Sequence, residues 1–325
     1  MTGSLDPRVS ATLRLPIDPG WVADVPVSAP NPLDGAQARG HVRRNDAIAK
    51  AVMADDVSAP GLPFGRVVTS DALAFVQSLP DRSVSLVLSS PPYLWKRTYG
   101  DDPAEVGREL TVTAYLGWTR RLFAEFARVL RPDGWVYWNV GDTYATVPSG
   151  YRGDPGKADT ISVTAREAAK GSSRVREFDV PGKSLSLVPW RLLCALVVED
   201  RWICRNVIAW HKPNHQPENV FDRQAQAWEP ILMLTRSPYP WYERTPPETG
   251  LDRDDHWSIP AGRRGAGAGH PAVFPADLAR RAIAHACPPG GVVLDPFAGS
   301  GTVMDMAAEL GRRALGCDLY EWRKE

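Results

Sequence analysis

Four consecutive residues, Ser90-Pro91-Pro92-Tyr93, combine a hydroxyl, a rigid backbone and an aromatic ring directly after a short apolar run. Neither proline has a backbone N–H, and each fixes its own φ angle, so the carbonyls past the run point in fixed directions and remain free to accept hydrogen bonds. Such acceptors, beside a hydroxyl and a flat ring, are suited to a planar group that carries an exocyclic amine. Prolines also simply end strands, and the tetrapeptide alone leaves both interpretations open.

A second motif, Asp295-Pro-Phe-Ala-Gly-Ser-Gly-Thr302, lies between a predicted strand and a predicted helix. Glycines at such a turn let a ligand approach the backbone closely. Asp318 ends the next predicted strand about 20 residues later, where a carboxylate can accept hydrogen bonds from ribose hydroxyls. A nicotinamide-binding Gly-x-Gly-x-x-Gly would need glycine where the chain has Met304, so a nucleoside without a pyrophosphate fits this turn better.

The elements that must position these motifs alternate between strand and helix from Arg66 onward. The continuous apolar run before Ser90 is typical of a strand buried on both faces of a parallel sheet. The alternation predicts right-handed crossovers and helices on both faces. Strands are predicted at 66–71, 84–89, 135–140, 202–210, 229–235, 291–294 and 314–317, and helices at 72–79, 114–130, 185–199, 276–286 and 302–310.

Taken together, the two motifs closely resemble those of the amino-group DNA methyltransferases, which use S-adenosylmethionine to modify cytosine N4 or adenine N6. The resemblance covers about residues 66–325, and the pair of motifs is far more specific than either alone. It implies an α/β fold of the circularly permuted, Rossmann-like methyltransferase type, with a mostly parallel seven-stranded sheet and helices on both faces. The catalytic half precedes the cofactor half in this permuted class.

The same resemblance implies which residues bind the cofactor. The Gly-Ser-Gly-Thr turn lines its methionine and ribose side, Asp318 takes the ribose, and Asp71 reaches the adenine edge. Phe274, in His270-Pro-Ala-Val-Phe-Pro275, is expected to pack over the cofactor, although ordinary core filling also explains a phenylalanine there. The cofactor-binding residues assigned in this way are Asp71, Phe274, Asp295, Phe297, Gly299, Ser300, Gly301, Thr302 and Asp318.

The chemistry of amine methylation assigns roles to the first motif. An exocyclic amine is a poor nucleophile because its lone pair is delocalised into the ring. It must be aligned with the methyl–sulfur bond, and acceptors must draw it toward tetrahedral geometry. We expect the Pro91 carbonyl and the Ser90 hydroxyl to be these acceptors, with Pro92 fixing the backbone and Tyr93 stacking on the base. The base must first be flipped out of the duplex, at a cost of a few kcal/mol.

The segment Trp210-His-Lys-Pro-Asn214, at the end of a predicted strand, resembles the family's motif near the flipped base. It predicts DNA contacts from His211, Lys212 and Asn214, although a solvated or structural role is also typical of a strand-end histidine. Serine rather than aspartate at position 90 favours cytosine N4, with adenine N6 as the alternative. Methylation of RNA or of protein glutamine is a further alternative, but glutamine methylation is typical of Asn at this position.

Four regions are predicted along the chain. The first is a proline-rich, partly disordered arm with a short helix near 46–53, and the third is a linker or small target-recognition segment. A long insert interrupts the second region. Their bounds are 1–63 for the arm, 64–235 for the catalytic half with its insert at 143–183, 236–269 for the linker and 270–325 for the cofactor-binding half.

Composition bounds the remaining possibilities. The 38 basic residues balance 38 acidic ones among 325, so a surface for double-stranded DNA must come from local clustering. The absence of a long apolar run and of a signal peptide predicts a cytoplasmic protein without a membrane partner. The four cysteines are too far apart to indicate a metal site.

Two rival functions are disfavoured by the motifs. A nucleotide-binding oxidoreductase conflicts with Met304, and a DNA-binding module without activity conflicts with the intact Ser90, Gly-Ser-Gly turn and Asp318. A restriction endonuclease that acts on the same DNA site is an expected partner.

Overall fold

The computed structural model describes residues 35–54, 62–97, 99–100, 102–145, 179–215, 217–218, 220–246, 254–262 and 274–322. The chain divides into two units, residues 1–43 and 44–325, and the sheet and all predicted site residues belong to the second. Helix α1 spans Gly35–Ala54 and is longer than the short helix expected near 46–53. The rest of the proline-rich arm up to residue 61, apart from α1, lies outside the described residues.

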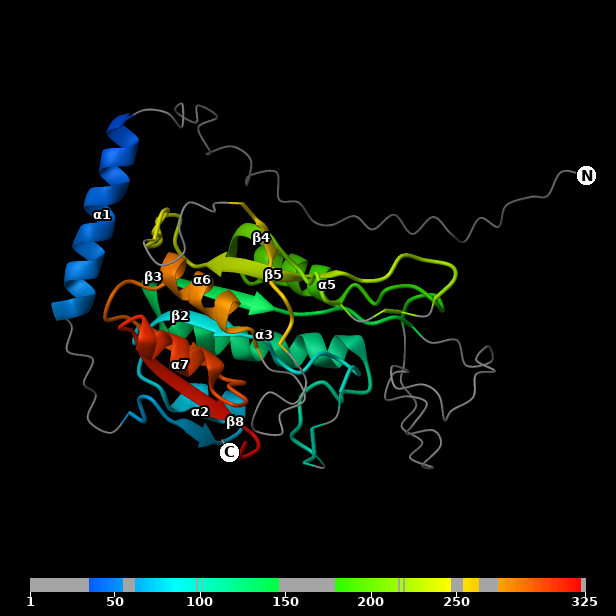
Figure 1. The fold of residues 1–325 in the computed structure, drawn as a ribbon. Coiled ribbons are helices and arrows are strands. Elements are labelled where there is room, and N and C mark those ends of the chain that lie inside the picture. Colours follow the sequence, from blue (N-terminus) through cyan, green and yellow to red (C-terminus); the bar gives the residue numbers. More distant parts are fainter. Residues whose placement is uncertain are drawn as a thin grey trace, which may run out of the picture. The chain divides into compact units, whose positions relative to one another are not determined.

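The core of the second unit is an eight-stranded sheet in the order β1-β8-β7-β2-β3-β5-β4-β6 (Figure 1). Neighbouring strands from β1 to β3 pair in parallel, β5 is antiparallel to both β3 and β4, and β6 is parallel to β4. This confirms the predicted mostly parallel α/β sheet. The strands are β1 (Val67–Thr69), β2 (Val84–Ser89), β3 (Leu130–Asn139), β4 (Ile203–His211), β5 (Trp228–Thr235), β6 (His256–Ser258), β7 (Val292–Asp295) and β8 (Arg313–Asp318).

The prediction of seven strands is wrong by one. Strand β6 lies within the 236–269 segment that was expected to be a linker or a small target-recognition segment, and it pairs with the edge of β4 through the register Trp210↔Trp257. Three residues are too few to show a strand periodicity. The buried Trp257 side chain, which packs against the core, stabilises the strand instead.

Helices cover both faces of the sheet, as predicted. On one face α2 (Ala72–Ser78), α3 (Val112–Val129) and α5 (Val188–Cys194) pack over Val87 and Trp138. On the other, α6 (Ala276–Ala286) and α7 (Thr302–Glu309) lie side by side over Leu86 and Leu88 (Figure 1). All six residues of β2 are buried, as its apolar run predicts.

Two element boundaries differ from the prediction because of long-range pairing. Strand β3 begins at Leu130, directly after α3, and Val84 of β2 pairs with that residue. The helix expected from residue 185 begins at Val188, because Leu185 forms a bridge with Tyr144. It ends in a π-helical turn, Ala195–Glu199. Residues 146–178 of the long insert lie outside the described part of the chain.

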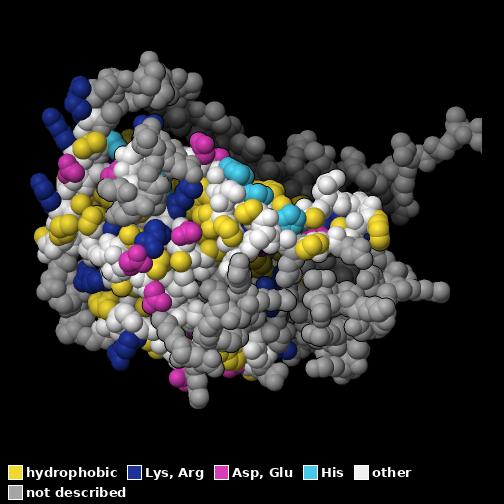
Figure 2. Space-filling view, in the orientation of Figure 1, with side chains coloured by type: hydrophobic (Ala, Val, Ile, Leu, Met, Phe, Trp, Pro, Cys, Tyr) yellow, Lys and Arg dark blue, Asp and Glu magenta, His cyan; other side chains and the backbone are white. Residues whose placement is uncertain are grey.

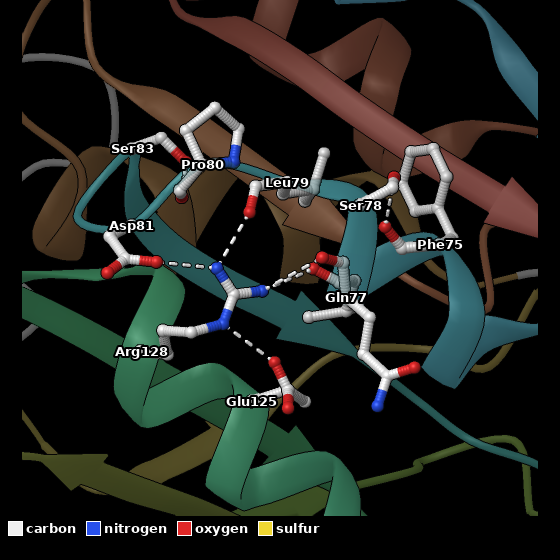
Figure 3. A network of polar contacts seen from close by, with 10 residues as sticks. Phe75, Gln77, Ser78, Leu79, Pro80, Asp81, Ser83, Glu125 and Arg128 are labelled. Carbon is white, nitrogen blue, oxygen red and sulfur yellow. Dashed lines mark hydrogen bonds and ion pairs between the residues drawn. The ribbon is translucent and has the colours of Figure 1, made fainter.

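One arginine joins α2 to α3 on the face that they share (Figure 3). Arg128 donates to the carbonyls of Val76 and Leu79, at 3.0 and 2.8 Å, where α2 ends. It also donates to the carboxylates of Asp81 and Glu125, at 2.7 and 2.8 Å. The last carbonyls of a helix have no partner within the helix. Arg128 therefore supplies a donor to the Leu79 carbonyl and a second donor to the Val76 carbonyl, which also accepts from the Leu79 amide at 3.1 Å.

The direction of the strands positions the site. The carboxyl ends of β1, β8, β7, β2, β3 and β4 meet at one edge of the sheet, together with the amino end of β5. In open α/β sheets, ligands bind outside this edge. The two motifs, although far apart in sequence, therefore belong to one edge.

Candidate active site

The two motifs meet where β2 lies beside β7. Leu86 and Val87 pair with Val293 and Leu294. One residue before the Ser-Pro-Pro-Tyr motif, the Ser89 hydroxyl donates to Oδ1 of Asp295 at 2.5 Å. Burial raises the pKa of Asp295 to about 7. Asp295, the first residue of the glycine-rich motif, is therefore hydrogen-bonded to the last residue of β2, the strand that precedes the Ser-Pro-Pro-Tyr motif.

Tyr93 is held at its hydroxyl. Its oxygen lies 2.8 Å from Oδ1 of Asn139 and 2.8 Å from Oε2 of Glu229, and it accepts a hydrogen bond from the Ser90 hydroxyl at 3.3 Å. Burial, and then the negative charge of Glu229, raise the pKa of Tyr93 well above its usual value. The phenol therefore stays protonated and donates to one of its two acceptors at a time.

The ring of Tyr93 is also held from the side. An added Cβ on Gly141, just past the end of β3, would lie 2.5 Å from Cε2 and 2.6 Å from Cδ2 of Tyr93. The ring thus rests against a backbone that has no side chain at this point. Glu229 on β5, Asn139 on β3 and Gly141 fix the orientation of the ring from two neighbouring strands.

The two proline carbonyls differ, which corrects the expectation that both remain free. The Pro92 carbonyl accepts a hydrogen bond from the Tyr115 hydroxyl at 3.1 Å. No donor among the described residues reaches the Pro91 carbonyl. The Ser90 hydroxyl uses its proton toward Tyr93 and keeps its lone pairs. An amine can therefore find two acceptors here, the Pro91 carbonyl and the Ser90 oxygen.

Asp318, at the end of β8, has room for a ribose hydroxyl. Its Oδ2 accepts from the Gly299 amide at 2.9 Å, and its Oδ1 accepts from the Tyr320 amide and the Trp322 indole at 3.0 and 2.9 Å. A carboxylate offers about four acceptor positions, so one on Oδ2 stays available. Gly299 and Gly301 have φ angles of 53° and 90°, which favour glycine. The donor and acceptor set therefore fits the nucleoside that the sequence predicts.

The other residues assigned to the cofactor have identifiable protein contacts. Asp71 caps α2 by accepting from the Ala74 amide at 2.9 Å, and it follows β1, whose Thr69 pairs with Asp318. Phe297 packs between Trp118 and Trp138, each 6.1 Å away between ring centroids. Ser300 and Thr302 are half-buried.

Phe274 packs against the hydrophobic core. It is partly buried against the hydrophobic cluster beneath α6 and α7. Residues 270–273 of its motif lie outside the described residues. Its assignment to the cofactor stays a prediction.

The three predicted DNA-contacting residues lie at or just after the carboxyl end of β4, at the same edge of the sheet as the two motifs, and each already has a protein partner. Lys212 forms an ion pair with Glu229 and lies 4.4 Å from the Trp210 ring centroid. Nδ1 of His211 lies 3.0 Å from the Ser258 hydroxyl, and its ring stacks on His256. Histidine side chains gather on the face shown in Figure 2.

Asn214 uses both ends of its amide on a single residue. Its Nδ2 donates to the Ala261 carbonyl at 3.0 Å, and its Oδ1 accepts from the Ala261 amide at 2.8 Å. This pair fastens the segment after β4 to the segment after β6. The side chain is therefore explained by its structural role.

Glu229, Asn139 and Gly141 were not found by sequence reasoning. A signal existed for Glu229, which is an acidic residue at the start of an otherwise apolar strand. Its contact with Tyr93 joins residues 136 positions apart, so no local pattern reports it.

The described part of the chain has neither a metal-binding cluster nor a membrane-spanning helix. No group of three or more His, Cys, Asp or Glu side chains there is arranged to hold a metal ion. No helix among these residues combines the length and the apolar character needed to cross a membrane.

Comparison with known proteins agrees with this geometry. The family model described as DNA methylase, of N6 and N4 type, matches residues 84–325. The Type II methyltransferase M.Cfr9I of Citrobacter freundii is 36% identical over 259 residues, which are 77% of this chain and 81% of that protein. M.SmaI of Serratia marcescens is 33% identical over 264 residues, covering 79% of this chain and 87% of that protein.

A solved structure shares the fold. The PvuII DNA methyltransferase (cytosine-N4-specific) superposes with a TM-score of 0.58 at 19% identity, covering 80% of this chain and 86% of that one. The predicted methyltransferase fold is thereby confirmed. With the family match over residues 84–325, the chain belongs to the N6/N4 DNA methylases, the amino-group DNA methyltransferases.

Proposed function

We propose that this protein is a site-specific DNA methyltransferase that transfers a methyl group from S-adenosylmethionine to N4 of a cytosine flipped out of double-stranded DNA. One observation carries the proposal: the Ser-Pro-Pro-Tyr strand and the glycine-rich strand are neighbours, joined by the hydrogen bond from Ser89 to Asp295. This arrangement lets a donor at the glycine-rich turn and a base at Tyr93 share one edge of the sheet.

The residues have distinct tasks in this proposal. When bound, S-adenosylmethionine supplies an electrophilic methyl group on a sulfonium. Tyr93, anchored by Glu229 and Asn139, stacks on the extruded base. The Pro91 carbonyl and the Ser90 oxygen accept the two amine hydrogens, which draws the nitrogen lone pair out of the ring plane toward the methyl group. Such alignment needs no covalent nucleophile.

The cofactor end is assigned to the glycine-rich turn and Asp318. The free acceptor position on Oδ2 of Asp318 binds a ribose hydroxyl, while the Gly299 amide keeps the carboxylate oriented. Gly299, Ser300, Gly301 and Thr302 line the methionine side, Asp71 reaches the adenine, and Phe274 and Phe297 flank the ligand. These roles rest on the motif positions and on the contacts described above.

The choice of cytosine rests on Ser90. Aspartate in this position is associated with adenine N6 methylation, and a neutral serine hydroxyl supplies one acceptor without a charge. The family to which the chain belongs includes both activities. Single-molecule sequencing of DNA from cells that express the protein reports the base, its position and the target site together. N6-methyladenine at the site would replace cytosine in the proposal.

Two variants test the division of labour. Ser90→Ala removes an acceptor for the amine, so methyl transfer should be abolished while S-adenosylmethionine binding, measured by calorimetry, is retained. Asp318→Ala removes the ribose acceptor and should weaken that binding. Equal loss of binding in both variants would contradict the assignment.

The remaining regions and partners are part of the same proposal. Residues 64–235 form the catalytic half and 270–325 the cofactor-binding half, while the 143–183 insert and the 236–269 segment contribute to target recognition. The relatives carry Type II names, which supports a cognate restriction endonuclease acting on the same site in the cytoplasm. Cleavage of unmethylated, but not methylated, DNA by the accompanying endonuclease tests this partnership.

A further inference from the structure

An aromatic side chain projects from the connection between β4 and β5. Phe221 is 96% exposed, the highest value among the large hydrophobic residues that the structure describes. Single exposed apolar residues are common, so exposure alone decides nothing. The way in which this residue is held, and the edge from which it projects, carry the argument.

The residues next to Phe221 are fixed, although Phe221 itself touches solvent. Asp222 forms an ion pair with Lys183. Arg223 lies 3.9 Å from the Tyr144 ring centroid and pairs with Glu218. Since both following residues are anchored, the Phe221 ring is carried on a supported tip rather than on a free loop.

The anchors connect this tip to the walls of the active site. Tyr144 and Lys183 belong to the short ladder that follows β3, in which the Lys183 amide donates to the Ala145 carbonyl at 2.9 Å. This ladder begins just after Gly141, which contacts the Tyr93 ring. Both sides of the tip are thus tied to residues near Tyr93.

The two ends of the β4–β5 connection are joined by an ion pair beside Tyr93. Lys212, directly after β4, pairs with Glu229 near the start of β5, and Glu229 contacts the Tyr93 hydroxyl. Figure 1 shows the connection between β4 and β5 extending beyond the sheet. Because β4 is parallel to β2, the connection that follows β4 begins at the edge of the sheet that carries the Ser-Pro-Pro-Tyr motif.

We propose that Phe221 is a wedge that enters the DNA base stack and fills the space left by the extruded base. The proposal rests on the proposed function, since it requires a flipped base. Apolar side chains inserted between base steps offset the loss of stacking, and a planar ring can stack on both neighbours. Phe221 is thereby a positioning residue, which shifts the target base toward Tyr93 without touching the reacting atoms.

Two DNA substrates and three variants test this assignment. Both duplexes contain the methylated site found by sequencing, one with the target correctly paired and one with an abasic site opposite the target. Phe221→Ala removes the wedge, and Phe221→Leu keeps an apolar one. Tyr239→Ala is the matched control, because Tyr239 is 63% exposed and follows the carboxyl end of β5, at the opposite edge of the sheet.

Single-turnover methylation should be at least tenfold slower for Phe221→Ala than for wild type on the paired duplex, and close to wild type on the duplex with the abasic site. Phe221→Leu should retain most of the rate, and Tyr239→Ala all of it. A wild-type rate for Phe221→Ala on the paired duplex overturns the proposal. So does an equal loss on both duplexes, which indicates weaker DNA binding. If wild type methylates neither duplex, the proposed function itself fails.

Discussion

Replacing Gly141 by alanine tests whether the position of the Tyr93 ring sets the rate of methyl transfer. The new Cβ would lie 2.5 Å from Cε2 and 2.6 Å from Cδ2 of Tyr93, whereas ordinary contacts begin near 3.4 Å. The ring or the end of β3 must therefore move by roughly 1 Å. Gly141 is not among the glycines with positive φ, so the effect is steric and not a strain of the backbone.

The expected loss follows from that displacement. A misplacement of about 1 Å in an active site can cost on the order of 100-fold in rate, because the reacting atoms leave their aligned geometry. Moving the ring also pulls the Tyr93 hydroxyl away from Asn139 and Glu229, which lie 2.8 Å from it. We expect a fall of about 100-fold in the single-turnover rate, with S-adenosylmethionine affinity unchanged.

The assay compares variants under single-turnover conditions with saturating cofactor and duplex. Gly117→Ala is the control, because a Cβ at this exposed position in α3 meets nothing within 4 Å. It should methylate at the wild-type rate. If Gly141→Ala also stays within about twofold of wild type, the orientation of Tyr93 does not limit transfer, and the reasoning is refuted.

Three further predictions address other contacts. Burial raises the pKa of Asp295 to about 7. Between roughly pH 4 and pH 7 the Asp295 carboxyl is therefore protonated in the folded protein but ionised in the unfolded chain. Because of this difference, the free energy of unfolding falls as the pH rises through this range. Asp295→Asn should remove that fall, and urea unfolding at pH 5 and pH 8 that matches wild type at both would contradict it. Arg128→Ala removes the hydrogen bonds to the Leu79 and Val76 carbonyls at the end of α2, of which the Val76 carbonyl keeps a second donor, the Leu79 amide, and it should lower the free energy of unfolding by about 1–3 kcal/mol. Substituting Arg121, an exposed residue of α3, the helix that also carries Arg128, by alanine should lower the free energy of unfolding far less. Glu229→Ala should slow methyl transfer about tenfold by removing one of the two acceptors that hold the Tyr93 hydroxyl, while Glu229→Gln, which keeps an acceptor at this position, should recover most of the rate. If both Glu229 variants were equally slow, the carboxylate would act through its charge rather than as a hydrogen-bond acceptor.

Local sequence determined most of the elements and both motifs. The apolar run of β2 predicts a strand buried on both faces, and the glycine-rich turn predicts a ligand site, because each depends on residues that are neighbours in the chain. The two motifs together predicted the family, which the match over residues 84–325 confirms. Since parallel strands present their carboxyl ends to one edge, the meeting of the motifs also followed from the sequence.

Tertiary structure alone decided how the site is held together. Strand β6 exists by pairing with β4, and its three residues are too short to carry a pattern. The Pro92 carbonyl is used by Tyr115, and the Tyr93 hydroxyl is shared between Asn139 and Glu229. These contacts join side chains from different elements, whose distances depend on the register and packing of the sheet. The periodicity of apolar residues indicates which face of an element a side chain occupies, but not which side chain of another element it contacts.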